Sequence, residues 1–247
     1  MKGVARLIWW RDLRAALSGT AGYGMLAGFL ALTGWSFAEL LRRNEGGFAS
    51  AQAIWGMAVA PWLPALAAAA TMRLFAEERQ TGTLETLLTA PVRAYDVVLG
   101  KFSAALSLVC TGIFLSLLQV HILRHVAPRM DGEFSIAGMI SATVLLFLQA
   151  AAWTAIGTFA SLMARQQAAA GVLTVLCIGA PYAAYAGLLA WMPRMRQSVW
   201  QWPPLGDVAD AATGLFALAP LVLYISVTWC VLFICVRLVE ARDLRTR

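Results

Sequence analysis

Two histidines and four cysteines are the residues of this chain best suited to metal or thiol chemistry. His121 and His125 are four residues apart, so both imidazole rings share one face of a helix, an arrangement that can chelate a metal ion. Two ligands do not complete a site, and no carboxylate or cysteine lies at a matching helical spacing. The cysteines all lie inside apolar runs and fit no zinc motif: Cys110, Cys177, Cys230 and Cys235. We therefore predict no metal site and no catalytic residue, and we interpret the cysteines as buried thiols or packing residues.

The sequence also lacks the residues that would bind a nucleotide or carry a coupling ion. Gly100-Lys101 is followed by Phe102 and position 95 is Tyr95, so this dipeptide does not belong to a phosphate-binding loop. No acidic or basic residue lies near the middle of any apolar run, where ion-coupled transporters usually place one. We expect the chain to bind no cofactor itself, so any ATP and magnesium that drive it must be bound by another polypeptide.

One segment between the second and third apolar runs has a distinct pattern. Gly82 interrupts the chain, Thr83 is a good N-cap, and Glu85 lies in the first turn, where the helix dipole favours an anion. Pro91 ends the pattern after about two turns. The apolar face consists of three leucines with i, i+3 and i+4 spacing: Leu84, Leu87 and Leu88. Such a short helix is marginal alone, so it must dock on lipid headgroups or in a groove of a cytoplasmic protein.

The elements that must position these residues are membrane-spanning helices. The 247-residue chain is 60% hydrophobic and 13% charged, whereas soluble domains have about 45–50% apolar and about 25% charged residues. We predict an all-α integral membrane protein with a single transmembrane domain over residues 1–247. Its six spans are 18–40, 52–75, 99–122, 136–162, 170–191 and 215–238. An amphipathic interfacial helix at 1–17 precedes them, a cytoplasmic segment covers 77–97, and Pro61 and Pro64 are expected to kink the second span.

The distribution of basic residues predicts the orientation. Thirteen of the nineteen Lys and Arg residues lie at the N-terminus, in 73–101, at Arg165 or at the C-terminus, and six lie in the other loops. Excess Lys and Arg mark cytoplasmic loops, so both termini are expected in the cytoplasm. The net charge of +6 is then explained by the basic residues of the cytoplasmic loops and does not indicate nucleic-acid binding. Trp9 and Trp10 are expected at the inner interface. Five others are expected near the outer one: Trp35, Trp55, Trp191, Trp200 and Trp202.

Small residues recur every four positions in three of the predicted spans. They are Gly24 and Gly28 in the first, Gly56, Ala60, Pro64 and Ala68 in the second, and Gly179, Ala183 and Gly187 in the fifth. Stripes of this kind let helix backbones approach closely. They indicate either packing inside one bundle or a dimer interface.

Two stretches of the sequence resemble the permease subunits of type-2 ABC exporters, most closely the branch of gliding-motility and nitrous-oxide-reductase-maturation permeases. The first stretch is Glu77-Glu78-Arg79-Gln80-Thr81-Gly82-Thr83-Leu84-Glu85-Thr86-Leu87-Leu88-Thr89-Ala90-Pro91-Val92, followed by Gly100-Lys101-Phe102. The second runs from Tyr224 through Arg237 to Arg242.

The resemblance implies six helices after an amphipathic helix, a dimer of permeases, and an ATPase subunit bound to each half. It implies that the loop after the second span contacts the ATPase through Glu77, Glu78, Gly82, Thr83 and Glu85, with Leu84, Leu87 and Leu88 on the docked face. It also implies short re-entrant outer helices in 193–214. The partners expected are a cytoplasmic ABC ATPase, a second permease copy or paralogue, membrane lipid and an extracytoplasmic accessory protein, with no nucleic acid.

Two other classes of function stay open from the sequence. A membrane scaffold would recruit partners without moving a substrate, and a secondary transporter would need a proton or ion gradient. The uncharged spans disfavour the second class. The residues leave open the substrate and the choice between a homodimer and a heterodimer, although wholly apolar spans suit a lipid or amphipathic cargo better than an ion.

Overall fold

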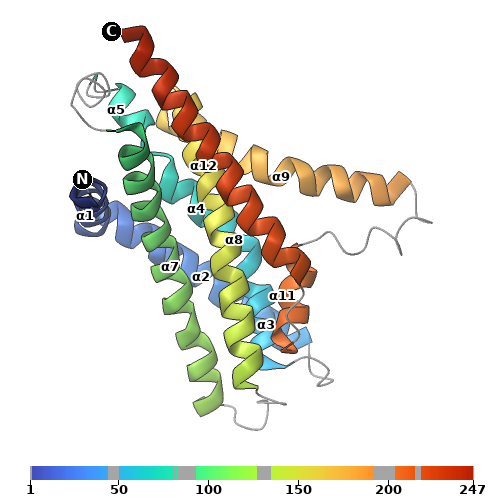
Figure 1. Cartoon of the computed structure of the whole chain (residues 1–247). Coiled ribbons are helices and arrows are strands. Elements are labelled where there is room, and N and C mark those ends of the chain that lie inside the picture. Colours follow the sequence, from blue (N-terminus) through green and yellow to red (C-terminus); the bar gives the residue numbers. More distant parts are fainter. Residues whose placement is uncertain are drawn as a thin grey trace.

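The computed structural model describes residues 2–43, 50–80, 82, 93–126, 135–191, 204–214 and 218–246 as a bundle in which all regular structure is helical (Figure 1). Five stretches within these ranges are long and apolar enough to cross a membrane. They are Thr20–Arg43, Ala51–Gln80, Ala94–Leu123, Ile136–Met163 and Leu218–Ala241. The prediction of an all-α membrane protein is confirmed, with five spans supported by length and composition.

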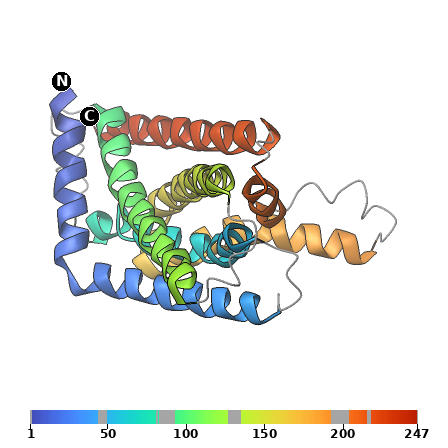
Figure 2. The ribbon, with the colours of Figure 1, turned by 90° about the horizontal axis from the view of Figure 1, so that it is seen from below.

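The N-terminal helix α1 (Lys2–Ser18) meets α2 (Thr20–Arg43) at an elbow, where Figure 2 shows a sharp change of direction. The elbow is tight, because a Cβ on Gly22 would lie 1.9 Å from the carbonyl oxygen of Ala16. α1 packs across the start of α7 (Ala94–Val126), where the indole of Trp9 donates a hydrogen bond to Ser107 Oγ over 2.9 Å. Trp10 on the same helix stays half-exposed. This arrangement agrees with an interfacial helix that has one face on the bundle and one face free for lipid.

The second predicted span is divided by its prolines into α3 (Ala51–Val59), the 3₁₀ turn η1 (Ala60–Trp62) and α4 (Leu63–Thr71). Proline lacks the N–H that would continue the α-helical ladder, so the expected distortion at Pro61 and Pro64 is confirmed. After a turn, the short helix α5 (Ala76–Gln80) follows. The cytoplasmic segment predicted at 77–97 is therefore partly helical, since its two ends belong to α5 and α7.

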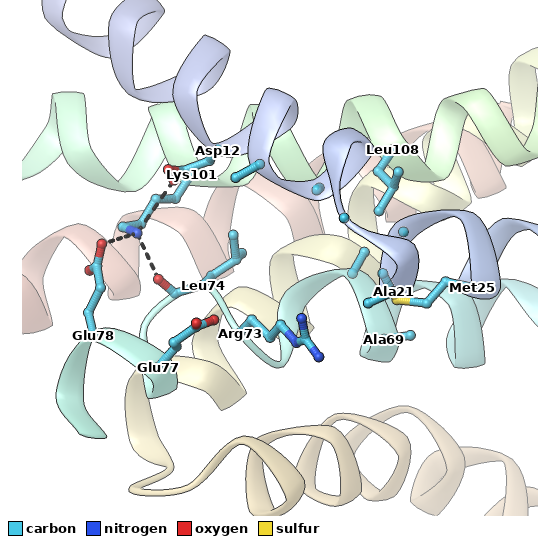
Figure 3. A pocket seen from close by; sticks show the side chains of 15 residues that line it. Asp12, Ala21, Met25, Ala69, Arg73, Leu74, Glu77, Glu78, Lys101 and Leu108 are labelled. Atoms are coloured by element: carbon cyan, nitrogen blue, oxygen red, sulfur yellow. Dashed lines mark hydrogen bonds and ion pairs between the residues drawn. The ribbon is translucent and has the colours of Figure 1, made fainter. Parts of the chain in front are cut away.

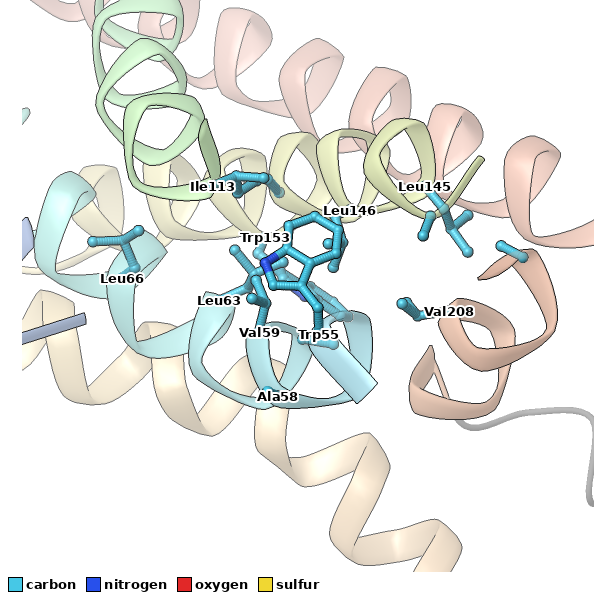
Figure 4. Close-up of a cluster of buried hydrophobic side chains, with 14 of the residues drawn as sticks. Trp55, Ala58, Val59, Leu63, Leu66, Ile113, Leu145, Leu146, Trp153 and Val208 are labelled. Carbon is cyan, nitrogen blue, oxygen red and sulfur yellow. The ribbon is translucent and has the colours of Figure 1, made fainter. Parts of the chain in front are cut away.

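α8 (Ile136–Met163) lies in the middle of the bundle. It contacts α3, α4 and α7, and also the three later helices at Gln167–Trp191, Pro204–Ala212 and Leu218–Thr246. Its neighbours form the core around Trp55, Leu63 and Leu146, each fully buried (Figure 4). The indole of Trp55 donates to the carbonyl oxygen and to Oγ of Ser116 on α7, both at 3.2 Å. The interpretation of Trp55 as an interfacial belt residue is wrong, because its N–H finds a partner inside the bundle and its ring fills the core.

Helix α9 (Gln167–Trp191) coincides with the fifth predicted span. Its buried side chains recur every four residues at Ala170, Thr174 and Ile178. Beyond them the helix leaves the bundle, as both views show (Figures 1 and 2). Where its side chains are described, the apolar part of α9 is Gln167–Pro181, which is shorter than a membrane span. The count of six spans therefore stays a prediction.

The last helix, α12 (Leu218–Thr246), returns along α8 and brings the C-terminus to the same end of the bundle as α1 and α5 (Figure 1). The opposite end holds α3 and the short helix α11 (Pro204–Ala212). Much of α12 is apolar and exposed, including Val222, Trp229 and Phe233. Contact of such an apolar surface with lipid is favourable, whereas its contact with water is unfavourable.

Candidate functional site

The residues singled out at the end of the second span lie on α5 and directly after it. Glu77 and Glu78 occupy the first turn of α5, where the helix dipole favours carboxylates. Gly82 has a φ of +72°, a left-handed conformation that side chains rarely adopt and that ends the helical path. Residues Thr83, Leu84, Glu85, Leu87 and Leu88 lie outside the described residues, so the docked helix predicted there stays a prediction.

A buried lysine joins α5 to two other helices. Lys101 of α7 is 2% exposed, and its ammonium donates to the carbonyl oxygen of Leu74 and to Glu78 Oε1, both at 2.7 Å (Figure 3). Asp12 of α1 lies 3.5 Å from the same nitrogen, and the ring of Phe75 lies 5.1 Å away. We call Lys101, Glu78, Asp12 and the Leu74 carbonyl the inner ion cluster.

The surroundings of the inner ion cluster make its charges interdependent. The side chains of Lys101, Asp12 and Glu78 are only 3%, 16% and 19% exposed, so the cluster is largely withdrawn from water. A charge in such surroundings is costly to leave unpaired, so each ion holds its partner in place. Arg11 adds an outer contact, 3.5 Å from Glu78 Oε1, and its hydrogen bond to Asp12 raises the pKa of the guanidinium.

The other side of the same turn is held by α8. Ser161 Oγ accepts hydrogen bonds from the backbone N–H groups of Phe75 and Ala76, at 3.1 and 3.3 Å, which satisfies donors at the start of α5. The guanidinium of Arg79 donates to the carbonyl oxygen of Ala164, at the end of α8, over 3.1 Å. α5 is thus fixed to α1, α7 and α8 by polar contacts.

A cavity of about 420 Å³ lies beside the inner ion cluster, between α1, α2, α4 and α7. One part of its wall carries Asp12, Glu77, Glu78 and Lys101, and the remainder is built from small or apolar side chains (Figure 3). Arg73 lies between the two parts. The volume of the cavity falls within the range of about 300–1,000 Å³ that is common for ligand pockets.

A family model for "ABC-2 family transporter protein" matches residues 37–236, which is more than half of the chain. The chain belongs to the ABC-2 transporter family. No curated protein matches the sequence. Family membership agrees with a multi-pass membrane protein and identifies the chain as a membrane subunit of a transport system.

Of the residues that this ABC-2 subunit was predicted to use for coupling, the structure brings Glu78 into the inner ion cluster and places Glu77 on the cavity wall. The prediction from sequence did not assign roles to Asp12, Lys101 or Ser161. One signal could have found Lys101, because a lone lysine inside the third apolar run needs a partner in a membrane protein. Nothing in the sequence pairs it with Asp12, which is 89 positions away.

The small-residue stripes differ in their surroundings. At Gly24, Gly28 and Gly179 an added Cβ would have no atom of another helix within 4 Å, and Ala183 is exposed. Nothing is described of the surroundings of Gly187, farther along α9. Gly56, by contrast, packs against Val208 of α11. The stripe of the second span thus serves packing inside the bundle, whereas the other two face outward.

The histidine pair and the cysteines gain no metal partners within the described part of the chain. The rings of His121 and His125 contact each other with centroids 4.5 Å apart. Among the described residues no three His, Cys, Asp or Glu side chains form a group that could hold a metal ion. Cys235 is buried as expected, but Cys177 and Cys230 are exposed on the outside of the bundle, so the expectation of burial is wrong for these two. The exposed faces of α9 and α12 accept an apolar thiol as readily as the core does.

Helix α11 closes the end of the bundle opposite to the inner ion cluster. Ser141 of α8 donates a hydrogen bond to the carbonyl oxygen of Ala211, and Gln52 Nε2 of α3 donates to that of Ala212 over 3.4 Å. A Cβ on Gly138 would lie only 2.1 Å from the Ala212 oxygen. α11 therefore docks by direct backbone contact. It is a short helix within 193–214, where short re-entrant outer helices are expected, and its position on the outer side of a membrane stays a prediction.

The docking of α11 should depend on pH through Asp207. Burial raises the pKa of the Asp207 carboxyl from 3.8 to about 6, and the charge of Asp210 adds to the shift. A carboxyl whose pKa is raised on folding stabilises the docked state below about pH 4, and this contribution is lost as the pH rises through about 6. We expect Asp207→Asn to increase hydrogen-exchange protection of the α11 amides at pH 7.5 and to leave it unchanged at pH 4. Asp96→Asn, on α7, is the matched control. Equal protection of wild type and Asp207→Asn at pH 7.5 would refute the assignment.

Proposed function

We propose that this chain is the permease subunit of an ATP-binding-cassette exporter in a bacterial inner membrane, with ATP and Mg²⁺ bound by a separate cytoplasmic ATPase. The observation that carries the proposal is the fixation of α5 by the inner ion cluster and Ser161 immediately before the segment 83–92. The resemblance of residues 77–92 to gliding-motility and nitrous-oxide-reductase-maturation permeases supports that branch of the family.

In this proposal the ends of the bundle have different roles. The end that holds α1, α5 and the C-terminus faces the cytoplasm, which the excess of Lys and Arg supports. The end that holds α3 and α11 faces outward, where α11 closes the path. An extracytoplasmic accessory protein would meet the permease at this outer end.

The proposed mechanism begins when closure of the ATPase pushes the helix at 83–90. α5 transmits the displacement because its backbone and side chains are bonded to α1, α7 and α8. α4 tilts relative to α3 at the 3₁₀ turn between them, where the prolines have already removed α-helical hydrogen bonds. Movement of α3 then shifts the position of α11, because α11 contacts α3 and η1.

We further propose that two permeases, either identical copies or paralogues, line the transport path. The outward-facing stripe of Gly24 and Gly28 on α2 and the stripe of Gly179 and Ala183 on α9 support this arrangement, since neither is covered within the described part of the chain. Small residues allow close helix contact in a membrane, where packing and not water exclusion drives association. The apolar surface between the stripes contacts membrane lipid.

The coupling role of 83–90 is tested by variants on each face of the predicted helix. Leu87→Asp places a charge on the docked apolar face, and Glu85→Lys reverses the charge near the helix N-terminus. We expect each to reduce co-purification of the ATPase by tenfold or more, since a buried charge or a lost charged contact costs on the order of 2–3 kcal/mol. Quantitative mass spectrometry of the purified complex is the measurement.

Glu240→Lys is the control, because Glu240 is an exposed residue of the C-terminal helix whose side chain pairs with Arg237 of the same helix. It should leave the amount of ATPase unchanged. If Leu87→Asp and Glu85→Lys both retain the wild-type amount of ATPase, the segment does not bind it. ATPase-dependent flux into vesicles separates an exporter from a scaffold, and a requirement for a proton gradient would instead favour a secondary transporter.

A further inference from the structure

We propose that the cavity beside the inner ion cluster binds one zwitterionic membrane phospholipid, with the lipid phosphate on Arg73. This resident lipid goes beyond the proposed function, because it binds whether or not an ATPase is present. The proposal rests on the composition of the cavity wall, on the state of its charges and on its position.

The wall of the cavity is amphipathic. Most of its apolar part consists of short side chains, together with the larger side chains of Met25, Leu74 and Leu108. The short side chains include Ala15, Ala21, Ala69 and Ala70. Short side chains leave room along the wall, and methionine adapts to an irregular apolar ligand. The opposite part carries charged groups (Figure 3). A ligand that fills both parts must have an ionic group and a hydrocarbon portion.

The charges of the wall select the headgroup. Lys101 is already bonded to Glu78 and to the Leu74 carbonyl. The exposed guanidinium of Arg73, in contrast, makes no hydrogen bond or ion pair within the described part of the chain, and Figure 3 shows it between Glu77 and Ala69. A guanidinium binds phosphate oxygens in a bidentate manner. Asp12 is likewise bonded, to Arg11 and Lys101. The carboxylate of Glu77 on the same wall repels a second negative charge and attracts an ammonium group.

The position of the cavity makes a bilayer lipid its natural occupant. Ala21, Gly22 and Met25 of the wall belong to the first turns of α2, and Tyr23 between them is 63% exposed. The cavity therefore borders the face of α2 that is turned toward lipid. α1 lies across its polar part, with Trp10 54% exposed, at the depth where amphipathic helices and aromatic rings meet headgroups. A soluble phosphate compound would use Arg73 but not the apolar wall.

The test uses the purified full-length chain, delipidated in detergent, with native mass spectrometry to count bound lipid. Phosphatidylethanolamine is added at increasing concentration, with phosphatidylglycerol, soluble glycerophosphoethanolamine and inorganic phosphate as separate arms. We expect one phosphatidylethanolamine per chain. Its binding should weaken by about tenfold or more in Arg73→Ala, since a charge-assisted hydrogen bond to phosphate is lost, and in Ala69→Leu, which fills the apolar part.

Arg165→Ala is the matched control, because Arg165 is also exposed at this end of the bundle but is not part of the cavity wall. It should bind lipid like wild type. Wild-type lipid binding by Arg73→Ala, or by Ala69→Leu, would overturn the proposal. Equal binding of phosphatidylglycerol would overturn the zwitterionic headgroup, and displacement of the lipid by equimolar glycerophosphoethanolamine or phosphate would show that only a free phosphate compound is recognised. None of these outcomes depends on whether the ATPase is found.

Discussion

Replacing Lys101 with Met is expected to lower the free energy of unfolding by about 2–4 kcal/mol. The substitution keeps an unbranched side chain, one atom shorter, and removes the ammonium that bonds Glu78 and the Leu74 carbonyl. The Glu78 carboxylate, with 19% of its side chain exposed, then keeps the longer contact to Arg11. Unfolding in mixed micelles with increasing denaturing detergent measures the loss.

A double-mutant cycle separates the ion pair from general damage to the core. Glu78→Gln removes the negative partner with little change in volume, and Lys101→Met combined with Glu78→Gln leaves no unpaired ion between the two positions. The double variant should lose at least about 1 kcal/mol less than the sum of the two single variants, since residues in contact couple by about 0.5–3 kcal/mol. Additive losses, or a single Lys101→Met variant as stable as wild type, would contradict the role given to the inner ion cluster.

Replacing Gly138 with Ala is expected to displace α11 and to cost about 2–4 kcal/mol. The new methyl would lie 2.1 Å from the carbonyl oxygen of Ala212, and a backbone atom cannot move aside alone. Overpacking of this kind costs about 1–3 kcal/mol. The shift also weakens the hydrogen bonds that Gln52 and Ser141 donate to α11, each worth about 1 kcal/mol. Hydrogen exchange across α11, together with unfolding in mixed micelles, measures the effect.

The control is Gly179→Ala, which adds the same methyl group to a helical glycine that has nothing within 4 Å of the added atom. It should leave α11 unchanged and stabilise α9 slightly, because alanine is preferred over glycine in a helix by about 0.5–1 kcal/mol. Unchanged protection of α11 in Gly138→Ala would mean that α11 is not held by the close contact with α8.

The elements of the fold could be predicted from the sequence where a local pattern determines them. Long apolar runs predict the helices that became α2, α7, α8 and α12, and the two prolines predict the interruption between α3 and α4. The ends were less accurate: α7 begins at Ala94 and α12 continues to Thr246, because charged residues extend a helix beyond the membrane core at no cost.

The surroundings of single residues could not be predicted in the same way. Trp55 resembles an interfacial tryptophan in sequence, and only its distant partner Ser116 places it in the core. Lys101, Asp12 and Ser161 come from three helices, and their contacts depend on how α1, α5 and α8 cross. The direction of α9 depends on its partners as well, since its apolar composition alone is that of an ordinary span.

The most direct test of the central claim is affinity purification of the tagged chain from its native membrane in mild detergent, followed by mass spectrometry. The proposal predicts that a protein with a phosphate-binding loop co-purifies in near-equal amount, in a complex whose mass corresponds to two permeases and two ATPase chains. A folded, intact chain that purifies with no such ATPase would contradict the account, and the scaffold and secondary-transporter alternatives would then take precedence.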